Sequence, residues 1–151
     1  MALMRGGEPM ALGVNEIFPH AVFLHANTPA DITKQYLTGM RTIILVDAVI
    51  NEGNTAVEMV TSIRKINTTI NIVVVAGVVQ ADSVRPDGKV HALLLEKHFS
   101  LVALRLSENK YKGSGATDTG DRLFNTTELG EGGEQDDKTD DMKADKGKKD
   151  E

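Results

Sequence analysis

The chain contains no cysteine and no tryptophan among its 151 residues. Without cysteine, disulfide bridges, thiolate metal sites and cysteine nucleophiles are all excluded. The four histidines show no HExxH motif or other clustered ligand spacing, so we predict no metal site made by the protein alone. Aromatic residues make up only 4% of the chain, which leaves the core to be filled mainly by aliphatic side chains.

Long apolar runs and a surplus of positive charge are missing too. No stretch approaches the ~20 apolar residues of a membrane span, and no signal-type run follows a basic start. We therefore expect no membrane association and a cytoplasmic location. Ten acidic residues and five lysines lie in residues 128–151, which accounts for the whole net charge of −5. Residues 1–127 are electrically balanced, which argues against a nucleic-acid surface.

The acidic segment also has almost no apolar residues. It cannot bury enough surface to offset the entropy lost on ordering. We predict one domain over residues 1–127 and a disordered, charged tail over residues 128–151. A solubilising tail without a specific partner is favoured over an interaction tail.

Residues 1–127 alternate β-branched runs with helical patterns, which predicts an α/β fold with a mostly parallel sheet and flanking helices. Strands are predicted at residues 43–46, 70–75 and 101–104, more weakly at 21–24, and at the very start of the chain. Helices are predicted over residues 10–17, 55–66 and 89–98. Arg64, Lys65 and Arg85 are predicted to be solvated surface charges.

Residues 43–55 carry the most informative pattern. A buried strand ends in Asp47, a short loop with Gly53 follows, and a helix begins at Thr55. Loop amides at a helix N-terminus bind anions, and a carboxylate at the carboxyl edge of a sheet accepts hydrogen bonds from sugar hydroxyls. This pattern alone fits an ordinary structural turn equally well. The sequence lacks a P-loop, and Gly113-Ser-Gly115 is no dinucleotide fingerprint.

Residues 43–55 resemble the phosphoribosyl-pyrophosphate (PRPP) motif of type I phosphoribosyltransferases, in which four apolar residues and an acid precede a loop close to T-G-G-[TS]. Asp47 is followed by Ala48 and not by a second acid, which is typical of the uracil branch. Residues 4–10, Met-Arg-Gly-Gly-Glu-Pro-Met, are similar to the R-A-G segment of that branch. Residues 111–122 are similar to its signature Y-x-x-P-G-x-G-D-x-G-D-R. Through these three ordered matches, the chain resembles the uracil phosphoribosyltransferase family.

The resemblance implies a pentosyltransferase of pyrimidine salvage that converts uracil and PRPP to UMP and diphosphate, with a type I phosphoribosyltransferase-like fold. It implies that PRPP, with Mg²⁺, is bound by Arg5, Asp47, Asn51, Glu52, Gly53, Asn54, Thr55 and Asp118. It implies that uracil is bound at Lys112, Thr117, Asp118 and Thr119. No catalytic acid or base is assigned, because positioning and charge stabilisation suffice when pyrophosphate leaves C1 through an oxocarbenium-like state.

Four departures from the family pattern predict reduced turnover. Residues 24–31 contain no arginine, whereas the family has an arginine arm there that clamps pyrophosphate. Glu52 replaces a hydroxyl residue, and a carboxylate beside a phosphate repels it unless it points away or meets Mg²⁺. Asn54 and Thr117 each replace a glycine. We expect these changes to spare the fold and to impair catalysis.

Two alternatives to a working enzyme remain open. The chain could be a non-catalytic module that binds PRPP or a uridine nucleotide, or a fragment that needs a partner chain. The family's domain extends upstream of the R-A-G segment, so we expect an exposed apolar face here. We also expect either a homo-oligomer or the remainder of a longer chain.

Overall fold

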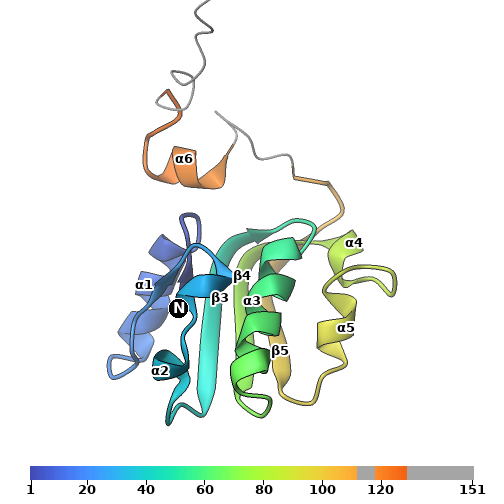
Figure 1. Ribbon diagram of the computed structural model, residues 1–151. Coiled ribbons are helices and arrows are strands. Elements are labelled where there is room, and N and C mark those ends of the chain that lie inside the picture. Colours follow the sequence, from blue (N-terminus) through green and yellow to red (C-terminus); the bar gives the residue numbers. More distant parts are fainter. Residues whose placement is uncertain (112–117, 129–151) are drawn as a thin grey trace, which may run out of the picture.

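The computed structural model describes residues 1–111 and 118–128. The described chain forms one five-stranded sheet with helices on both faces (Figure 1). Every strand pairing is parallel, as predicted. In spatial order the strands are β2 (His25–Ala26), β1 (Ala2–Leu3), β3 (Thr42–Ile50), β4 (Asn71–Gln80) and β5 (Phe99–Ser107). The predicted disordered tail lies almost wholly outside the described residues.

The helices follow the strands in the alternating order expected of an α/β fold. They are α1 (Glu8–Ile17), the 3-10 helix η1 (Pro29–Asp31), α2 (Lys34–Leu37), α3 (Asn54–Ile66), α4 (Ala81–Val84), α5 (His91–Leu94) and α6 (Thr119–Leu123). None of the described helices is long and apolar enough to cross a membrane.

The three strong β-branched runs, the first strand and the helices at 10–17 and 55–66 are confirmed. Two predictions are wrong. Residues 21–24 form no strand, although the carbonyl of Leu24 accepts a hydrogen bond from the amide of Ala2 at 2.7 Å. The helix predicted over residues 89–98 is limited to α5. The amides of Leu95 and Glu96 bond to carbonyls three residues back, and this tighter turn ends the helix and leads the chain to β5.

The main core lies between α3 and the sheet. Met59, Val60 and Ile63 of α3 are at most 1% exposed and belong to one cluster with the sheet residues Leu45 and Val74. The apolar stripe read from the sequence therefore faces the strands. Burying such side chains contributes about 1.5–3 kcal/mol each, so this contact stabilises the fold strongly.

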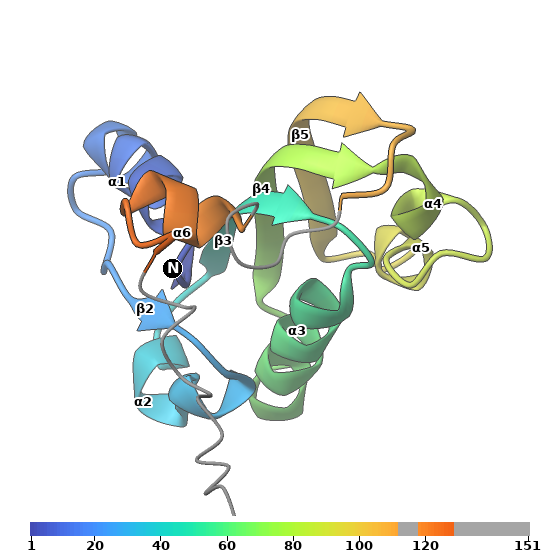
Figure 2. The same cartoon turned by 90° about the horizontal axis from the view of Figure 1, so that it is seen from above.

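The opposite face of the sheet is only partly covered. There α1 packs on β3 through a small cluster that includes Ala2, Ala11 and Val46 (Figure 2). Further along the sheet, Val102 and Leu104 of β5 are 51% and 83% exposed. The exposed apolar face expected from the sequence is confirmed.

Within each of the two central strands, the core-facing positions switch from odd to even residue numbers or the reverse, which we call a phase change. On β3 the core residues on the α3 side are Ile43 and Leu45, then Ile50. On β4 the phase changes in the same way, from residues 72, 74 and 76 to residue 79. The register between the two strands is the same before and after the change. Asp47 lies at this level, where the strands are about to end.

Gly7 allows the start of α1 to lie against the backbone of β3. A Cβ atom added to Gly7 would lie 2.1 Å from the carbonyl oxygen of Val46 and 2.7 Å from that of Leu3. Neither oxygen belongs to a flexible side chain, so any side chain at this position would force the helix away from the sheet.

We predict that Gly7→Ala lowers the free energy of unfolding by about 3 kcal/mol, the upper range for overpacking. Gly13→Ala is the matched control, because an added Cβ there meets nothing within 4 Å and lies inside α1. The control should be neutral or gain about 1 kcal/mol from helix propensity. Urea denaturation of both variants measures the difference. Equal stability of the two would contradict the close approach at Gly7.

Candidate functional site

The loop between β3 and α3 encloses a cavity of about 300 Å³, which Asp47, Val49 and residues 50–56 line. Gly53 precedes α3 with a left-handed backbone, φ 84°. A side chain there would also collide with Val90, since an added Cβ would lie 2.3 Å from its Cγ2. The first-turn amides of α3 and the positive end of its dipole thus border the cavity, which suits an anion.

Asp47 reaches this cavity from the carboxyl end of β3. Burial raises the pKa of its carboxyl to about 6, although hydrogen bonds from the backbone amides of Val49 and Ala48 oppose the shift. The carboxylate is therefore mostly ionised at pH 7, and it is partly desolvated. Such a group gains from accepting hydrogen bonds from a ligand.

The turn before α1 lies between Asp47 and α6. A Cβ added to Gly6 would lie 3.9 Å from Asp47 Oδ1 and 3.8 Å from Thr119 Cγ2. Figures 1 and 2 show α6 above the carboxyl edge of the sheet, near α1 and β3. The described parts of the three sequence motifs, which lie far apart in the chain, therefore meet at one edge of the sheet.

Arg5 attaches α6 to this turn. Its guanidinium forms an ion pair with Asp121 and donates a hydrogen bond to Thr126 Oγ1 at 3.2 Å. Arg5 and then the Thr126 hydroxyl hold the pKa of Asp121 below its usual range. A phosphate contact by Arg5, as implied by the family resemblance, would share the guanidinium with these partners or replace them.

Asp118 directly precedes α6 and caps its N-terminus. Its Oδ1 accepts a hydrogen bond from the backbone amide of Asp121 at 2.9 Å. An added Cβ on Gly120 would lie 3.1 Å from the same oxygen and 3.3 Å from Arg5 Cβ. Asp118 thus has a structural role that the sequence motif did not reveal, in addition to its position beside the site.

A second link joins the loop after β3 to α6. Asn51 Nδ2 donates to the carbonyl oxygen of Tyr111 at 2.6 Å. The Tyr111 hydroxyl and Thr119 Oγ1 share a hydrogen bond of 2.7 Å. Asn51 Oδ1 is buried, and no described residue donates to it. This link was missed, because Asn51 and Tyr111 are 60 residues apart and no local pattern connects them.

Glu52 lies among positive charges. Its Oε1 is 3.0 Å from Lys110 Nζ and its Oε2 is 3.6 Å from Lys89 Nζ. These lysines, Lys110 first, hold the pKa of Glu52 below its usual range. Lys89 also donates to Asn54 Oδ1 at 2.6 Å. The expected repulsion of phosphate by Glu52 is thus offset by two cations that the sequence did not point to.

A model of the family described as "Uracil phosphoribosyltransferase" matches residues 1–126. This chain belongs to the uracil phosphoribosyltransferase family. Among solved structures, it is similar to the AQ2163 protein from Aquifex aeolicus, with a TM-score of 0.57 and 15% identity. The match covers 82% of this chain but 62% of that one, and at this identity it shows the fold alone. No curated protein matches.

Most of the residues that the family resemblance singled out lie together at the carboxyl edge. They are Arg5, Asp47, residues 51–55, Asp118 and Thr119. Lys112 and Thr117, which are expected to contact uracil, lie outside the described residues. Among residues 1–111 and 118–128 no group of three or more histidine or acidic side chains is arranged to hold a metal ion.

We predict that Asp47→Asn stabilises the unliganded domain at neutral pH. The folded-state pKa of Asp47 is about 6, above the value of ~3.9 for an unfolded chain. Its contribution to stability is therefore fully present below pH ~4 and is lost as the pH rises through 6. The variant avoids this loss and should gain about 2 kcal/mol at pH 7.5 and almost nothing at pH 4.

Urea denaturation at both pH values measures this gain. Asp121→Asn is the control of opposite sign, because the pKa of Asp121 is lowered and its ionised form is the one that stabilises the fold. An Asp47→Asn protein less stable than wild type at pH 7.5 would contradict the desolvation of Asp47.

Proposed function

We propose that this domain binds PRPP with Mg²⁺ and transfers the phosphoribosyl group to N1 of uracil, giving UMP and diphosphate. The observation that carries the proposal is the position of Asp47 beside both the amide-lined cavity and α6. A phosphorylated sugar needs an anion site and a hydroxyl acceptor a short distance apart. This edge of the sheet offers both.

In this proposal the loop at residues 51–55 binds the 5′-phosphate, assisted by the dipole of α3. The ionised carboxylate of Asp47 accepts hydrogen bonds from the ribose hydroxyls. The C1–oxygen bond to pyrophosphate breaks as N1 of uracil bonds to C1, and the N1 proton passes to solvent. The domain contributes by holding the reactants and by placing dipoles where charge develops.

The base would lie on the α6 side of Asp47. Lys112, Thr117, Asp118 and Thr119 are the proposed contacts there. The available carboxylates fit Mg²⁺ that arrives with PRPP, because this ion prefers one or two carboxylates plus substrate phosphates to a cage made wholly of protein. Asp118 would be its ligand from this chain. When bound, Mg²⁺ would neutralise charge on the departing pyrophosphate.

A second function, binding without catalysis, is favoured by the segment around β2. Residues 24–31 contain neither lysine nor arginine. Asp31 closes this segment into a turn by accepting hydrogen bonds from the amides of Asn27 and Thr28, both at 2.8 Å. Its histidine, His25, contacts Glu8 at 2.9 Å. This segment therefore offers little positive charge to a departing pyrophosphate.

Calorimetry and turnover separate the two functions. We predict that the full chain binds PRPP–Mg²⁺ and that Asp47→Asn weakens binding at least about tenfold, the loss of one charge-assisted contact. Glu58→Gln, an exposed change on α3, is the control for altered net charge and should bind like wild type.

A radiolabel assay for UMP from uracil and PRPP then decides between them. Binding together with UMP formation supports the transferase. Binding without UMP supports the second function. Absence of PRPP binding, or an Asp47→Asn protein that binds like wild type, rejects both.

A further inference from the structure

Two lysines from separate segments pair with one carboxylate that lines the cavity between β3 and α3. Lys89 follows α4, Lys110 follows β5, and Glu52 belongs to the loop that lines the cavity. The three side chains are 54%, 59% and 48% exposed, in that order. Exposed ion pairs add little stability, so solvent and ligands exchange with them easily.

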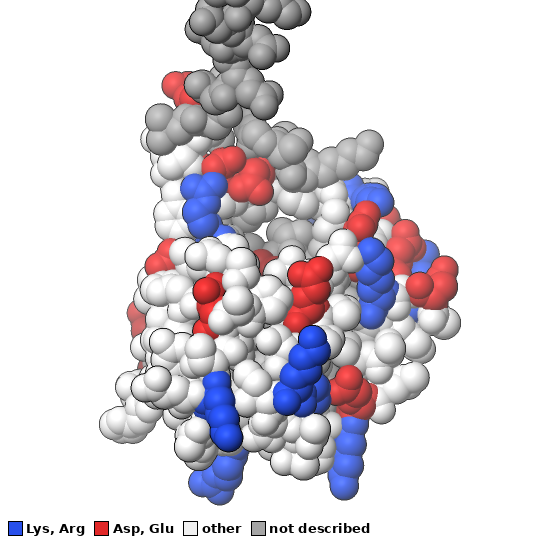
Figure 3. Space-filling model, viewed as in Figure 1, with Lys and Arg blue, Asp and Glu red and all other residues white. Residues whose placement is uncertain are grey.

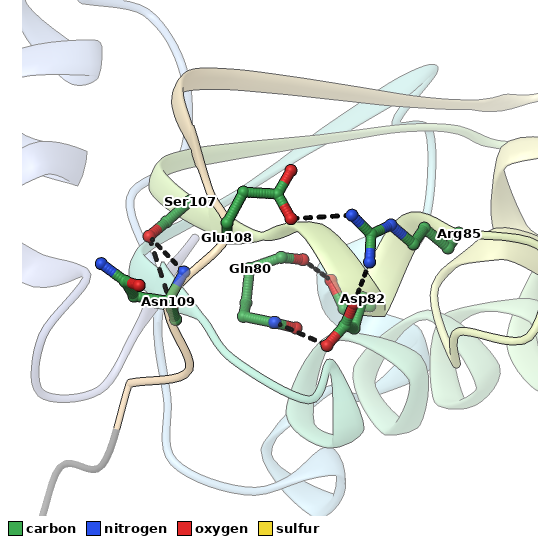
Figure 4. Close-up of polar contacts among 7 residues, drawn as sticks. Gln80, Asp82, Arg85, Ser107, Glu108 and Asn109 are labelled. Carbon is green, nitrogen blue, oxygen red and sulfur yellow. Dashed lines mark hydrogen bonds and ion pairs between the residues drawn. The ribbon is translucent and has the colours of Figure 1, made fainter.

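The segments that carry both lysines also make contacts that do not involve Glu52. Arg85 bridges Asp82 at 2.6 Å and Glu108 at 2.7 Å (Figure 4). Asp82 also accepts a hydrogen bond from the buried amide of Gln80 at 3.0 Å. Arg85 thereby joins the end of β5, two residues before Lys110, to α4.

The turn that carries Lys89 is held from the same side. The amide of Gly88 bonds to the carbonyl of Arg85 at 2.7 Å, and that of Val90 bonds to the carbonyl of Ser83 at 2.9 Å. In Figure 3, acidic and basic side chains lie side by side over α4 and the turn that follows it. Backbone hydrogen bonds thus hold the turn that carries Lys89, and Arg85 joins this turn to the segment that carries Lys110.

The loop that lines the cavity supplies no cationic side chain of its own to phosphate groups. Residues 47–55 include two acids and no lysine or arginine. Arg5 is already paired with Asp121. Phosphate groups placed beside Asp47 and Glu52 without a cation nearby would be repelled.

We propose that Lys89 and Lys110 form a cationic pair that binds the phosphate groups of the ligand, and that Glu52 occupies this pair in the unliganded protein. The inference rests on the proposed binding of PRPP and assigns positive charge to a site whose own loop has none. When the ligand binds, its phosphate oxygens replace the Glu52 carboxylate at one or both lysines. Glu52 thus competes with the ligand.

The test is calorimetric titration of the full chain with PRPP–Mg²⁺ and, separately, with inorganic pyrophosphate. Lys89→Ala and Lys110→Ala should each weaken binding about tenfold, and Lys89→Arg and Lys110→Arg should restore most of it. Glu52→Gln should tighten binding several-fold. Since the contacts are ionic, the salt dependence of affinity should be smaller in both alanine variants. Lys65→Ala and Lys97→Ala, exposed lysines on other parts of the surface, are the controls.

The outcomes separate this inference from the proposed function. If Lys89→Ala, Lys110→Ala and Glu52→Gln bind like the control variants while Asp47→Asn loses binding, the cationic pair is wrong and the PRPP site stands. If wild type binds neither PRPP nor pyrophosphate, both are wrong. Thermal melting of each variant identifies losses that come from unfolding, and an alanine variant that melts early is judged by the arginine variant at the same position.

Discussion

The contact on which the site depends is the close approach of the backbone at Gly7 to β3. It holds β1 and the start of α1 against the carbonyl of Val46, one residue before Asp47. Because Gly6 precedes this contact, it comes to lie between Asp47 and Thr119. Arg5, one residue further back, is placed to hold α6 through Asp121. A short run of small residues therefore sets the distance between the end of β3 and the segment above it.

The acids at this edge differ in how they are compensated. Asp121 has Arg5, Glu52 has two lysines, and Asp118 accepts from the amide of Asp121 in the first turn of α6. Burial of Asp47 disfavours its ionised form, and only hydrogen bonds from backbone amides oppose this effect. Among the described residues no cation pairs with it. The ionised Asp47 carboxylate therefore lowers the stability of this fold, as is common for groups that bind a ligand.

The fold was largely predictable because the strong β-branched runs and the stripe of α3 each specify one partner surface. The ends of α5 could not be predicted, because the turns that lead into β5 end the helix before its apolar pattern does. Arg64 and Arg85 were predicted to be solvated, which is wrong for Arg64. It is 17% exposed and donates to the carbonyls of Ile70 and His98. The site motifs were visible in the sequence, but Lys89 and Lys110 were not, because their partner Glu52 lies 37 and 58 residues away.

The phase change shared by β3 and β4 restricts how this domain can vary. A one-residue deletion in either strand would reverse which side chains beyond it face the core. Both strands change phase at the same level, and β4 keeps a constant register with β3 and with β5 across it. A deletion in one of these strands would therefore have to be matched in the strands that pair with it.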